Sequence, residues 1–181
     1  MKIAPRRLAG TFEIALAPHG DERGHFMRWY DEAAFAAAGL PTRWVQGNES
    51  LSRRGVVRGL HFQRPPHAET KLVRAATGAV YDVFVDLRAG SPTYGEWDAV
   101  ELSAGRHNAV LVPKGFAHGF CVLSESALVT YLVDSPYAPH AEGGLAWDDP
   151  QLAIAWPVEG EPVVSAKDRR WPRLADLEPL G

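Results

Sequence analysis

Short apolar stretches, separated by glycine, proline, asparagine and aspartate, run through most of the chain. Alternation of apolar and polar residues predicts a β-strand, because successive side chains of a strand point to opposite faces of the sheet. The stretches that show such strand-like patterns are 9–16, 26–30, 42–50, 55–62, 70–77, 79–87, 96–102, 108–113, 119–124 and 127–134. Their recurrence at about 8–12-residue spacing is typical of an all-β sandwich or barrel.

The clearest alternation lies in "AVYDVFVDL", residues 79–87. We expect one face of this strand to carry Tyr81, Val83, Val85 and Leu87, and the other to carry Val80, Asp82, Phe84 and Asp86. No helical pattern alternates with the strands, which argues against a doubly wound parallel sheet. The predicted fold is therefore all-β, an eight-stranded double-sheet β roll (jelly roll) whose interior leaves room for a ligand.

Helix is predicted in two places only. In "YDEAAFAAAGLP", Asp31 can cap a short N-terminal helix, and Gly39 with Pro41 ends it. The proline-rich stretch 147–174 predicts irregular structure wrapped over the body, followed by a minor C-terminal helical segment near "LADLEP".

Composition limits the possible classes. The chain has 181 residues, enough for one domain with a substantial core, and we expect a single domain over residues 1–181. The net charge of −3 gives no global attraction to nucleic acid or to an anionic membrane. Cys121 is the only cysteine, the N-terminus lacks the apolar stretch of a signal peptide, and no apolar run is long enough to span a bilayer. These features predict a cytoplasmic protein that binds neither nucleic acid nor membrane.

The stretch "RGLHFQ", residues 58–63, places Arg58 and His61 three positions apart within one predicted strand. Strict alternation would send the two side chains to opposite faces. Gly59 lies between them, and glycine inside a strand often marks a bulge. We therefore expect the strand to depart from regular pairing near Gly59, so that both side chains reach one cavity.

The stretch "PKGFAHGF", residues 113–120, resembles the second motif of the cupin superfamily, in which the histidine binds a metal. The corresponding first motif would contain His-x-His, whereas "GLHFQRPPHAETK" offers only His61 and His67. Because a metal site usually needs three or four ligands, we expect no metal and interpret His118 as a polar residue of a pocket, or else as a hydrogen-bonded histidine of the sheet.

Several motifs gain significance from their order. The series is "DERG", "VQGN", "GVVRGLHFQ", "KLVRAATGAVYDVFVDLRAGSPTYGEW", "VPKGFAHGF", "YLVDSPYAP", "GLAWDDP", "IAWP" and "SAKD". In this order, over roughly residues 10–175, the chain closely resembles the dTDP-4-dehydrorhamnose 3,5-epimerase family. The resemblance implies a cupin-like double-sheet β roll, a homodimer, no metal or other cofactor, and a dTDP-linked 4-keto-6-deoxyhexose as the small-molecule substrate.

The resemblance also implies site residues. His61 would be the base, Asp168 of "SAKD" its partner, and Tyr131 the acid on the other side of the sugar. Asp82 is a second candidate to orient His61, with a structural role equally open. The positions that match substrate-binding residues of the family are Arg23, Phe26, Gln46, Asn48, Arg58, Lys71, His118, Tyr137, Glu142 and Lys167.

Four positions depart from the usual family pattern. Arg28 stands where the family usually has a glutamate, Gly47 and Glu49 replace the residues that usually flank Asn48, and Leu132 follows the tyrosine where several relatives have lysine. These departures affect the expected details of nucleotide recognition and leave the base, its partner and the acid in place.

The sequence is also compatible with other functions. The nearest alternative is an epimerase that inverts only C3 or only C5 of a related sugar. A metal-dependent cupin enzyme, a non-catalytic sugar-binding cupin and a purely structural β roll are more distant alternatives. In the structural roll, the basic residues would be scattered over the surface instead of meeting in one cavity.

Overall fold

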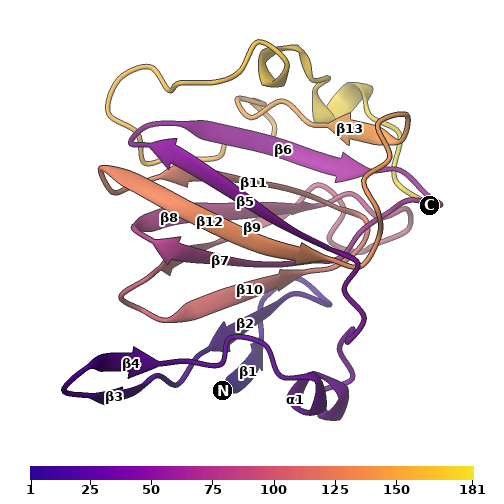
Figure 1. Ribbon diagram of the computed structural model, residues 1–181. Coiled ribbons are helices and arrows are strands. Elements are labelled where there is room, and N and C mark those ends of the chain that lie inside the picture. Colours follow the sequence, from indigo (N-terminus) through magenta and orange to yellow (C-terminus); the bar gives the residue numbers. More distant parts are fainter.

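The computed structural model describes all residues, 1–181, and its main feature is a pair of packed antiparallel sheets (Figure 1). The larger sheet has six strands, in the order β1 (Lys2–Pro5), β2 (Phe12–Ala15), β10 (Asn108–Val112), β7 (Lys71–Thr77), β12 (Ser126–Val133) and β5 (Gln46–Arg53). The smaller sheet has five, in the order β13 (Glu142–Gly144), β6 (Val57–Gln63), β11 (Phe116–Val122), β8 (Ala79–Asp86) and β9 (Trp97–Ser103). The all-β double-sheet prediction is confirmed, but the sheets contain six and five strands instead of eight in total.

The main core fills the space between the two sheets. Val73 and Val129 of the larger sheet pack against Val80, Phe84 and other inward-facing residues of the smaller one. On β8, Val80 and Phe84 face this core, whereas Val83, Val85 and the following Leu87 join a second cluster on the outer face. The alternation predicted for residues 79–87 is thereby confirmed, and both faces of β8 are covered.

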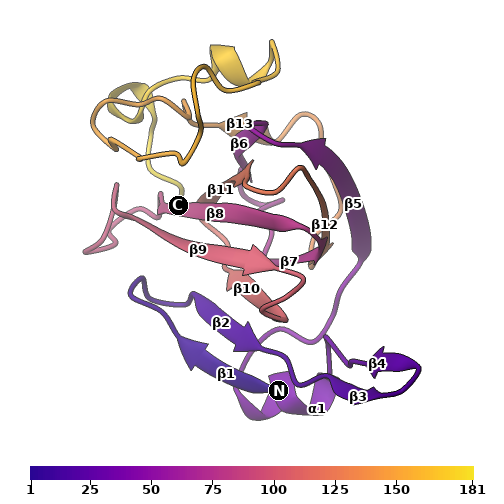
Figure 2. The same ribbon diagram turned by 90° about the vertical axis from the view of Figure 1, so that its left-hand side faces the viewer.

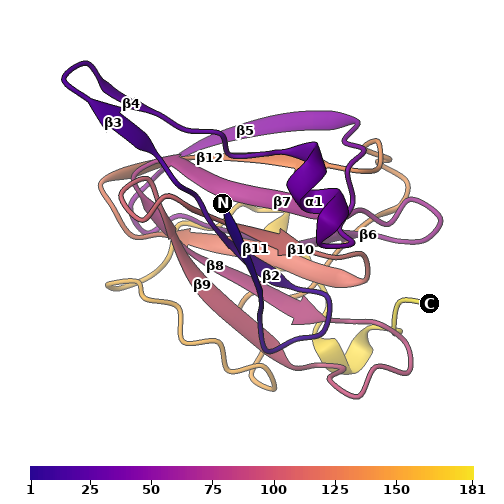
Figure 3. The same ribbon diagram turned by 90° about the horizontal axis from the view of Figure 1, so that it is seen from below.

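Each sheet is also covered on its outer face. Helix α1 (Glu32–Ala37) places Phe35 against Ile14 and Leu72 of the larger sheet, and Figure 3 shows the helix lying across that sheet. The C-terminal segment covers the smaller sheet, where Leu152 and Leu174 are buried; Figure 2 shows this segment wrapped over β13 and β6.

The predicted helix signals are confirmed. Asp31 accepts a hydrogen bond from the Ala34 N–H at 3.0 Å and caps α1, and Gly39 follows the helix with a φ of 69°. The C-terminal region is irregular except for two short 3₁₀ helices, η1 (Asp168–Arg170) and η2 (Leu174–Asp176).

A two-stranded hairpin, β3 (His19–Asp21) and β4 (Gly24–Phe26), projects from the body of the molecule (Figures 1 and 3). Strand pairing stops at Phe26, so most of the strand predicted over residues 26–30 is absent. Trp29 and Tyr30 instead pack beside α1 in the outer cluster, where their large side chains are covered without strand geometry. No helix of the protein is long and apolar enough to cross a membrane.

Candidate active site

Two adjoining cavities open between the sheets, where β5 and β12 face β6 and β11. The first, of about 290 Å³, is lined by Glu49, Ser50, Arg58, His61, Lys71, His118, Gly119, Phe120, Val129 and Tyr131. The second, of about 270 Å³, is lined by Gln46, Asn48, His61, Phe62, Gln63, Glu69, Lys71, Tyr131, Val133, Tyr137 and Glu142. Three polar residues, His61, Lys71 and Tyr131, line both cavities and mark where they meet.

A β-bulge at Gly59 brings Arg58 and His61 into one cavity. On β11, His118 pairs with His61 and Phe120 pairs with Arg58, so two residues of β6 lie opposite one residue of β11. This extra residue returns Arg58 to the face that carries His61, and both line the first cavity. The departure from regular pairing predicted from the sequence is confirmed.

The bulge requires glycine on two counts. Gly59 has a φ of 133°, a conformation that residues with a side chain rarely adopt. A Cβ atom at this position would lie 2.7 Å from the Cα of Gly119 on β11. Gly59 therefore permits the bulge that turns the preceding residue, Arg58, toward the cavity.

His61 and Asp168 form a hydrogen-bonded pair at the wall of the cavity. The Nε2 atom of His61 lies 2.7 Å from Oδ1 of Asp168, and the His61 side chain is one-third exposed while that of Asp168 is buried. An ionised carboxylate can only accept, so Nε2 carries the proton and Nδ1 keeps its lone pair. An imidazole held in this tautomer can take up a proton at Nδ1.

Asp168 is itself held by three other groups. The Gly59 N–H donates to its Oδ2 at 3.3 Å, Trp171 Nε1 donates to Oδ1 at 3.1 Å, and its own N–H donates to Ser165 at 3.0 Å. Burial raises the pKa of Asp168, but its hydrogen-bond donors, His61 first, more than offset this and hold the pKa below its ordinary value. The residue therefore stays ionised beside the imidazole.

His118 also has a carboxylate partner, but a different one. Its Nε2 atom lies 3.0 and 2.9 Å from the two oxygens of Asp82, which is fully buried in β8. The alternative that Asp82 orients His61 is wrong, because Asp82 pairs with His118 and Asp168 pairs with His61. No group of three or more His, Cys, Asp or Glu side chains is arranged to hold a metal ion.

Tyr131 lies on the opposite sheet from His61. It belongs to β12, whereas His61 belongs to β6, and both side chains line the cavity between the sheets. Burial raises the pKa of Tyr131, the nearby Glu69 carboxylate raises it further, and Arg58 lowers it. The phenol therefore stays protonated at neutral pH and is able to donate a proton.

Two cations line the first cavity with these residues. Lys71 is buried, and its ammonium lies 3.3 Å from Glu69 and 3.4 Å from the carbonyl oxygen of His61. The Arg58 guanidinium donates from Nε to the Ser52 hydroxyl at 2.9 Å. Positive charge at a partly buried site favours a phosphate or a developing oxyanion.

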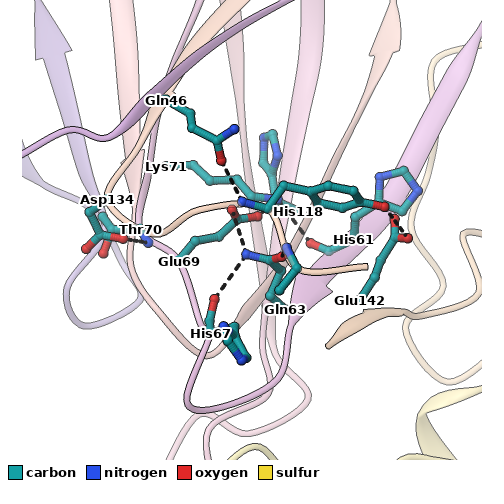
Figure 4. A network of polar contacts seen from close by, with 12 residues as sticks. Gln46, His61, Gln63, His67, Glu69, Thr70, Lys71, His118, Asp134 and Glu142 are labelled. Carbon is teal, nitrogen blue, oxygen red and sulfur yellow. Dashed lines mark hydrogen bonds and ion pairs between the residues drawn. The ribbon is translucent and has the colours of Figure 1, made fainter. Parts of the chain in front are cut away.

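The second cavity brings together several residues expected to bind substrate, and Figure 4 shows their polar contacts. Gln46 accepts from the Tyr137 N–H at 2.5 Å, and the Tyr137 hydroxyl donates to Glu142 at 3.0 Å. Lys167 donates to the other Glu142 oxygen at 2.5 Å. Burial raises the pKa of Glu142, but these hydrogen bonds more than offset it and hold the pKa below its ordinary value. Asn48 lies in the same wall.

Two predicted binding residues lie elsewhere in the chain. Arg23, in the β3–β4 hairpin, is paired with Asp21, and Phe26 at the end of the hairpin is 67% exposed. Neither residue lines the cavities around His61. Phe26 lines a separate cavity of about 380 Å³ together with Arg28, one of the positions that depart from the family pattern.

The structure adds site residues that the motifs did not indicate. Glu69 and Gln63 line the second cavity, Ser50 lines the first, and Trp171 anchors Asp168. Trp171 follows Asp168 by three positions, a spacing that becomes informative only once the η1 turn is known. Gln63 is the last residue of "RGLHFQ" and follows His61 by two positions. Side chains two positions apart in a strand point to the same face, and this spacing is the signal that could have indicated Gln63.

The comparisons with known proteins agree with this geometry. The family model described as dTDP-4-dehydrorhamnose 3,5-epimerase matches residues 5–176. The chain belongs to this family.

Individual members are similar over nearly their whole length. The dTDP-4-dehydrorhamnose 3,5-epimerase of Methanothermobacter thermautotrophicus is 46% identical over 171 residues, which cover 93% of this chain and 92% of the relative. The dTDP-4-dehydrorhamnose 3-epimerase of Streptomyces niveus is 43% identical, covering 100% of this chain and 87% of the relative. The crystal structure of the Legionella pneumophila enzyme in complex with dTDP-4-keto-L-rhamnose superposes with a TM-score of 0.93 at 39% identity, covering 98% of this chain and 94% of that one.

Among members of the dTDP-4-dehydrorhamnose 3,5-epimerase family, this chain has Gly47 and Glu49 on either side of Asn48. Glu49 lines the first cavity, whereas Gly47 faces the side chain of Leu132. Gly47 thus lies beside Leu132, another of the four departures, and Glu49 lies at the cavity. His61 and Tyr131 line the cavity with these residues in place.

Proposed function

We propose that this epimerase inverts C3 and C5 of dTDP-4-keto-6-deoxy-D-glucose to give dTDP-4-keto-L-rhamnose. The observation that carries the proposal is the placement of the His61–Asp168 pair and Tyr131 on facing sheets, lining one cavity. A sugar ring between the two sheets would meet a base on one side and an acid on the other. Inversion needs this arrangement, because the proton must leave one face of the carbon and return to the opposite face.

The chemistry follows from the ketone at C4. His61 Nδ1 takes the proton from the carbon beside the ketone, and the electrons of that C–H bond pass into an enolate whose charge rests on the C4 oxygen. Lys71 and Arg58 supply positive charge for this oxyanion or for the diphosphate. At C5, Tyr131 donates its proton from the other face; at C3, a proton from solvent water adds to the enolate from the face opposite His61. The ketone re-forms each time, and exchange with solvent restores the phenol and the neutral imidazole. No electrons are gained or lost overall.

The second cavity is suited to the nucleotide end of the substrate. Gln46, Asn48 and Tyr137 offer hydrogen-bonding groups there, and Glu142 and Lys167 close its edge. The Legionella pneumophila structure holds a dTDP-sugar, which supports the same class of substrate here.

The alternative of a single-centre epimerase has specific support. The Streptomyces niveus relative is named a 3-epimerase, and the Streptomyces bikiniensis structure in complex with dTDP-quinovose is described as a 3'-monoepimerase. The His61 and Tyr131 pair does not by itself separate the two functions, because the Streptomyces bikiniensis 3'-monoepimerase also has a histidine and a tyrosine, which its double mutant replaces. Double inversion is favoured by the Pseudomonas aeruginosa relative, which is named a 3,5-epimerase and is 48% identical.

The deciding experiment is incubation of the protein with dTDP-4-keto-6-deoxyglucose in deuterium oxide. We expect deuterium at both C3 and C5, and the L-rhamno product, detected by NMR. Deuterium at one centre only would establish the single-centre alternative. Absence of exchange at both centres would exclude the epimerase function for this substrate, and sugar-nucleotide binding without exchange would indicate a binding module.

We also propose that the protein is a homodimer in which each β3–β4 hairpin completes the partner's cavity. The support is the exposure of Arg23 and Phe26, two expected substrate-binding residues that do not line the cavities of their own chain. An apolar side chain that is 67% exposed on a projecting hairpin is suited to a partner surface.

Subunit mixing tests this arrangement. We expect an Arg23→Ala, Phe26→Ala variant and a His61→Ala variant to be nearly inactive alone, but to recover about one quarter of native activity when mixed and allowed to exchange subunits, since half the dimers are then mixed and each has one intact site. A mixture of His61→Ala with Asp168→Asn is the matched control and should recover nothing, because both residues belong to the same chain's cavity. If neither mixture recovers activity, the hairpin does not contribute to the partner's cavity, and the proposed arrangement is wrong.

A further inference from the structure

The proposed reaction gives no role to the Glu69 carboxylate, which forms an ion pair with Lys71 inside the cavity. The side chains of Lys71 and Glu69 are only 9% and 14% exposed, and their charged atoms lie 3.3 Å apart. Both line the second cavity, and Lys71 also lines the first. A negative charge in a site that must attract a diphosphate weakens that attraction, so the carboxylate needs a separate reason.

Glu69 is firmly held by Gln63. The Gln63 side-chain amide, which is buried, donates to Glu69 Oε2 at 3.2 Å and to the His67 carbonyl at 3.0 Å, and Figure 4 shows it between these two oxygens. Its carbonyl accepts from the Ala138 N–H at 2.6 Å, which ties the loop before β7 to the loop after β12. One glutamine thus fixes both the carboxylate and the cavity wall.

The start of β7 is fixed as well. The Thr70 N–H donates to Asp134 at 2.7 Å, and the other Asp134 oxygen lies 3.3 Å from Lys114. The backbone of Lys71 is therefore anchored on one side, and its ammonium is anchored by Glu69. The flexible lysine chain has little freedom left.

We propose that Glu69, held by Gln63, is a positioning residue of this site: its carboxylate fixes the Lys71 ammonium where the two cavities meet. The proposal rests on the proposed function, because Lys71 has catalytic meaning only if an oxyanion or diphosphate lies there. Glu69 itself contacts neither reacting carbon; it acts by holding Lys71 and by the electrostatic effect of its charge on Tyr131.

The groups around Tyr131 define what a change at Glu69 would do. The titratable and charged groups that line the two cavities with Tyr131 are Glu49 from β5, Lys71 from β7, Glu69 from the loop before it, Arg58 and His61 from β6, His118 from β11 with Asp82 behind it, Glu142 from β13, and Tyr137 from the loop after β12. Among these, Glu69 raises the pKa of Tyr131 and Arg58 lowers it. Loss of the Glu69 charge would therefore let the phenol ionise at lower pH.

The test compares Glu69→Gln, which keeps length and loses charge, with Glu69→Asp, which keeps charge and loses reach. We expect Glu69→Gln to lower kcat for C5 exchange roughly 10- to 100-fold with little change in KM, because misplacing a catalytic group by about 1 Å costs that order. For Glu69→Gln, the alkaline limb of the pH–rate profile should move to lower pH. Glu69→Asp should have a lower kcat but the native alkaline limb. If Glu69→Gln does not fold, Glu69→Asp still tests the proposal through its kcat.

Two comparisons make the result decisive. In a Lys71→Met background, Glu69→Gln should lower kcat little further, because the two residues act as a unit. Glu96→Gln, which removes an exposed glutamate paired with Arg7, should leave kcat and the pH profile native. A Glu69→Gln variant with native kcat and pH profile would overturn the proposal while leaving the epimerase function intact. Failure of the native protein to exchange deuterium would instead remove the proposed function itself.

Discussion

Replacing His61 by alanine is expected to abolish deuterium incorporation at both C3 and C5. The His61 imidazole lines both cavities, and Asp168 fixes its proton on Nε2, which leaves Nδ1 free to accept a proton. Loss of a general base typically costs about 10²–10⁴-fold in rate. The measurement is NMR of the dTDP-sugar in deuterium oxide, under conditions where the native protein exchanges both positions fully.

The control for this variant is another histidine that lies outside the site. His107 occupies the turn between β9 and β10 with a φ of 50°, a conformation that asparagine tolerates, so His107→Asn should exchange both centres at the native rate. The effect of His61→Ala should be mainly on rate, since Lys71 and the other residues that line the second cavity are unchanged. Native exchange at either centre in His61→Ala would show that another group serves as base there, and His118, which shares the cavity, would be the next residue to replace.

Local sequence rules were sufficient for the central strand of the site. Alternation placed Arg58 and His61 on opposite faces, and Gly59 between them indicated where the alternation would break. The observed bulge, with a φ of 133° at Gly59, follows from a property that the residue type alone carries. The faces of β8 and the cap of α1 were predictable for the same reason, because each depends on neighbours in sequence.

Pairings between distant segments were beyond such rules. Two buried carboxylates, Asp82 and Asp168, were both candidates to orient His61. The packing of η1 against β6 assigns Asp168 to His61, and the pairing of β8 with β11 assigns Asp82 to His118. In the sequence, Glu69 simply lies between a proline-rich turn and a strand, and nothing there indicates a role. Its role becomes visible only from its contacts with Gln63 and Lys71. The predicted number of strands was too low for a similar reason. The short strands β1 and β13, for example, are defined only by their pairing with β2 and β6.

The hairpin shows a further limit. Arg23 and Phe26 match binding positions by motif, yet their own chain holds them away from the cavity. A motif records that a residue meets the substrate and not which copy of the chain supplies it. A second chain that provides the missing wall would reconcile the motif with the fold.

Replacing Tyr131 by phenylalanine is expected to separate the two inversions. The aromatic ring stays, so packing against Val129 and the core is preserved, while the proton donor is lost. We expect inversion at C5 to fall by about 10²-fold or more, the cost of losing a general acid. Deuterium should still enter at C3 within several-fold of the native rate, because His61 continues to form the enolate.

The products distinguish this outcome from general damage. NMR of the Tyr131→Phe reaction in deuterium oxide should show a sugar that carries deuterium at C3 and keeps the configuration of the starting substrate at C5. Tyr81→Phe is the matched control, since Tyr81 is a part-buried tyrosine of β8 packed against Trp156 on the outer face of the sheet, and it should invert both centres normally. If Tyr131→Phe inverts C5 at the native rate, the phenol is not the acid, and the raised pKa of Tyr131 reflects only its burial near Glu69. If exchange at C3 and at C5 fall together, the hydroxyl instead holds the substrate for both steps, and the two inversions share one arrangement of the ring between the sheets.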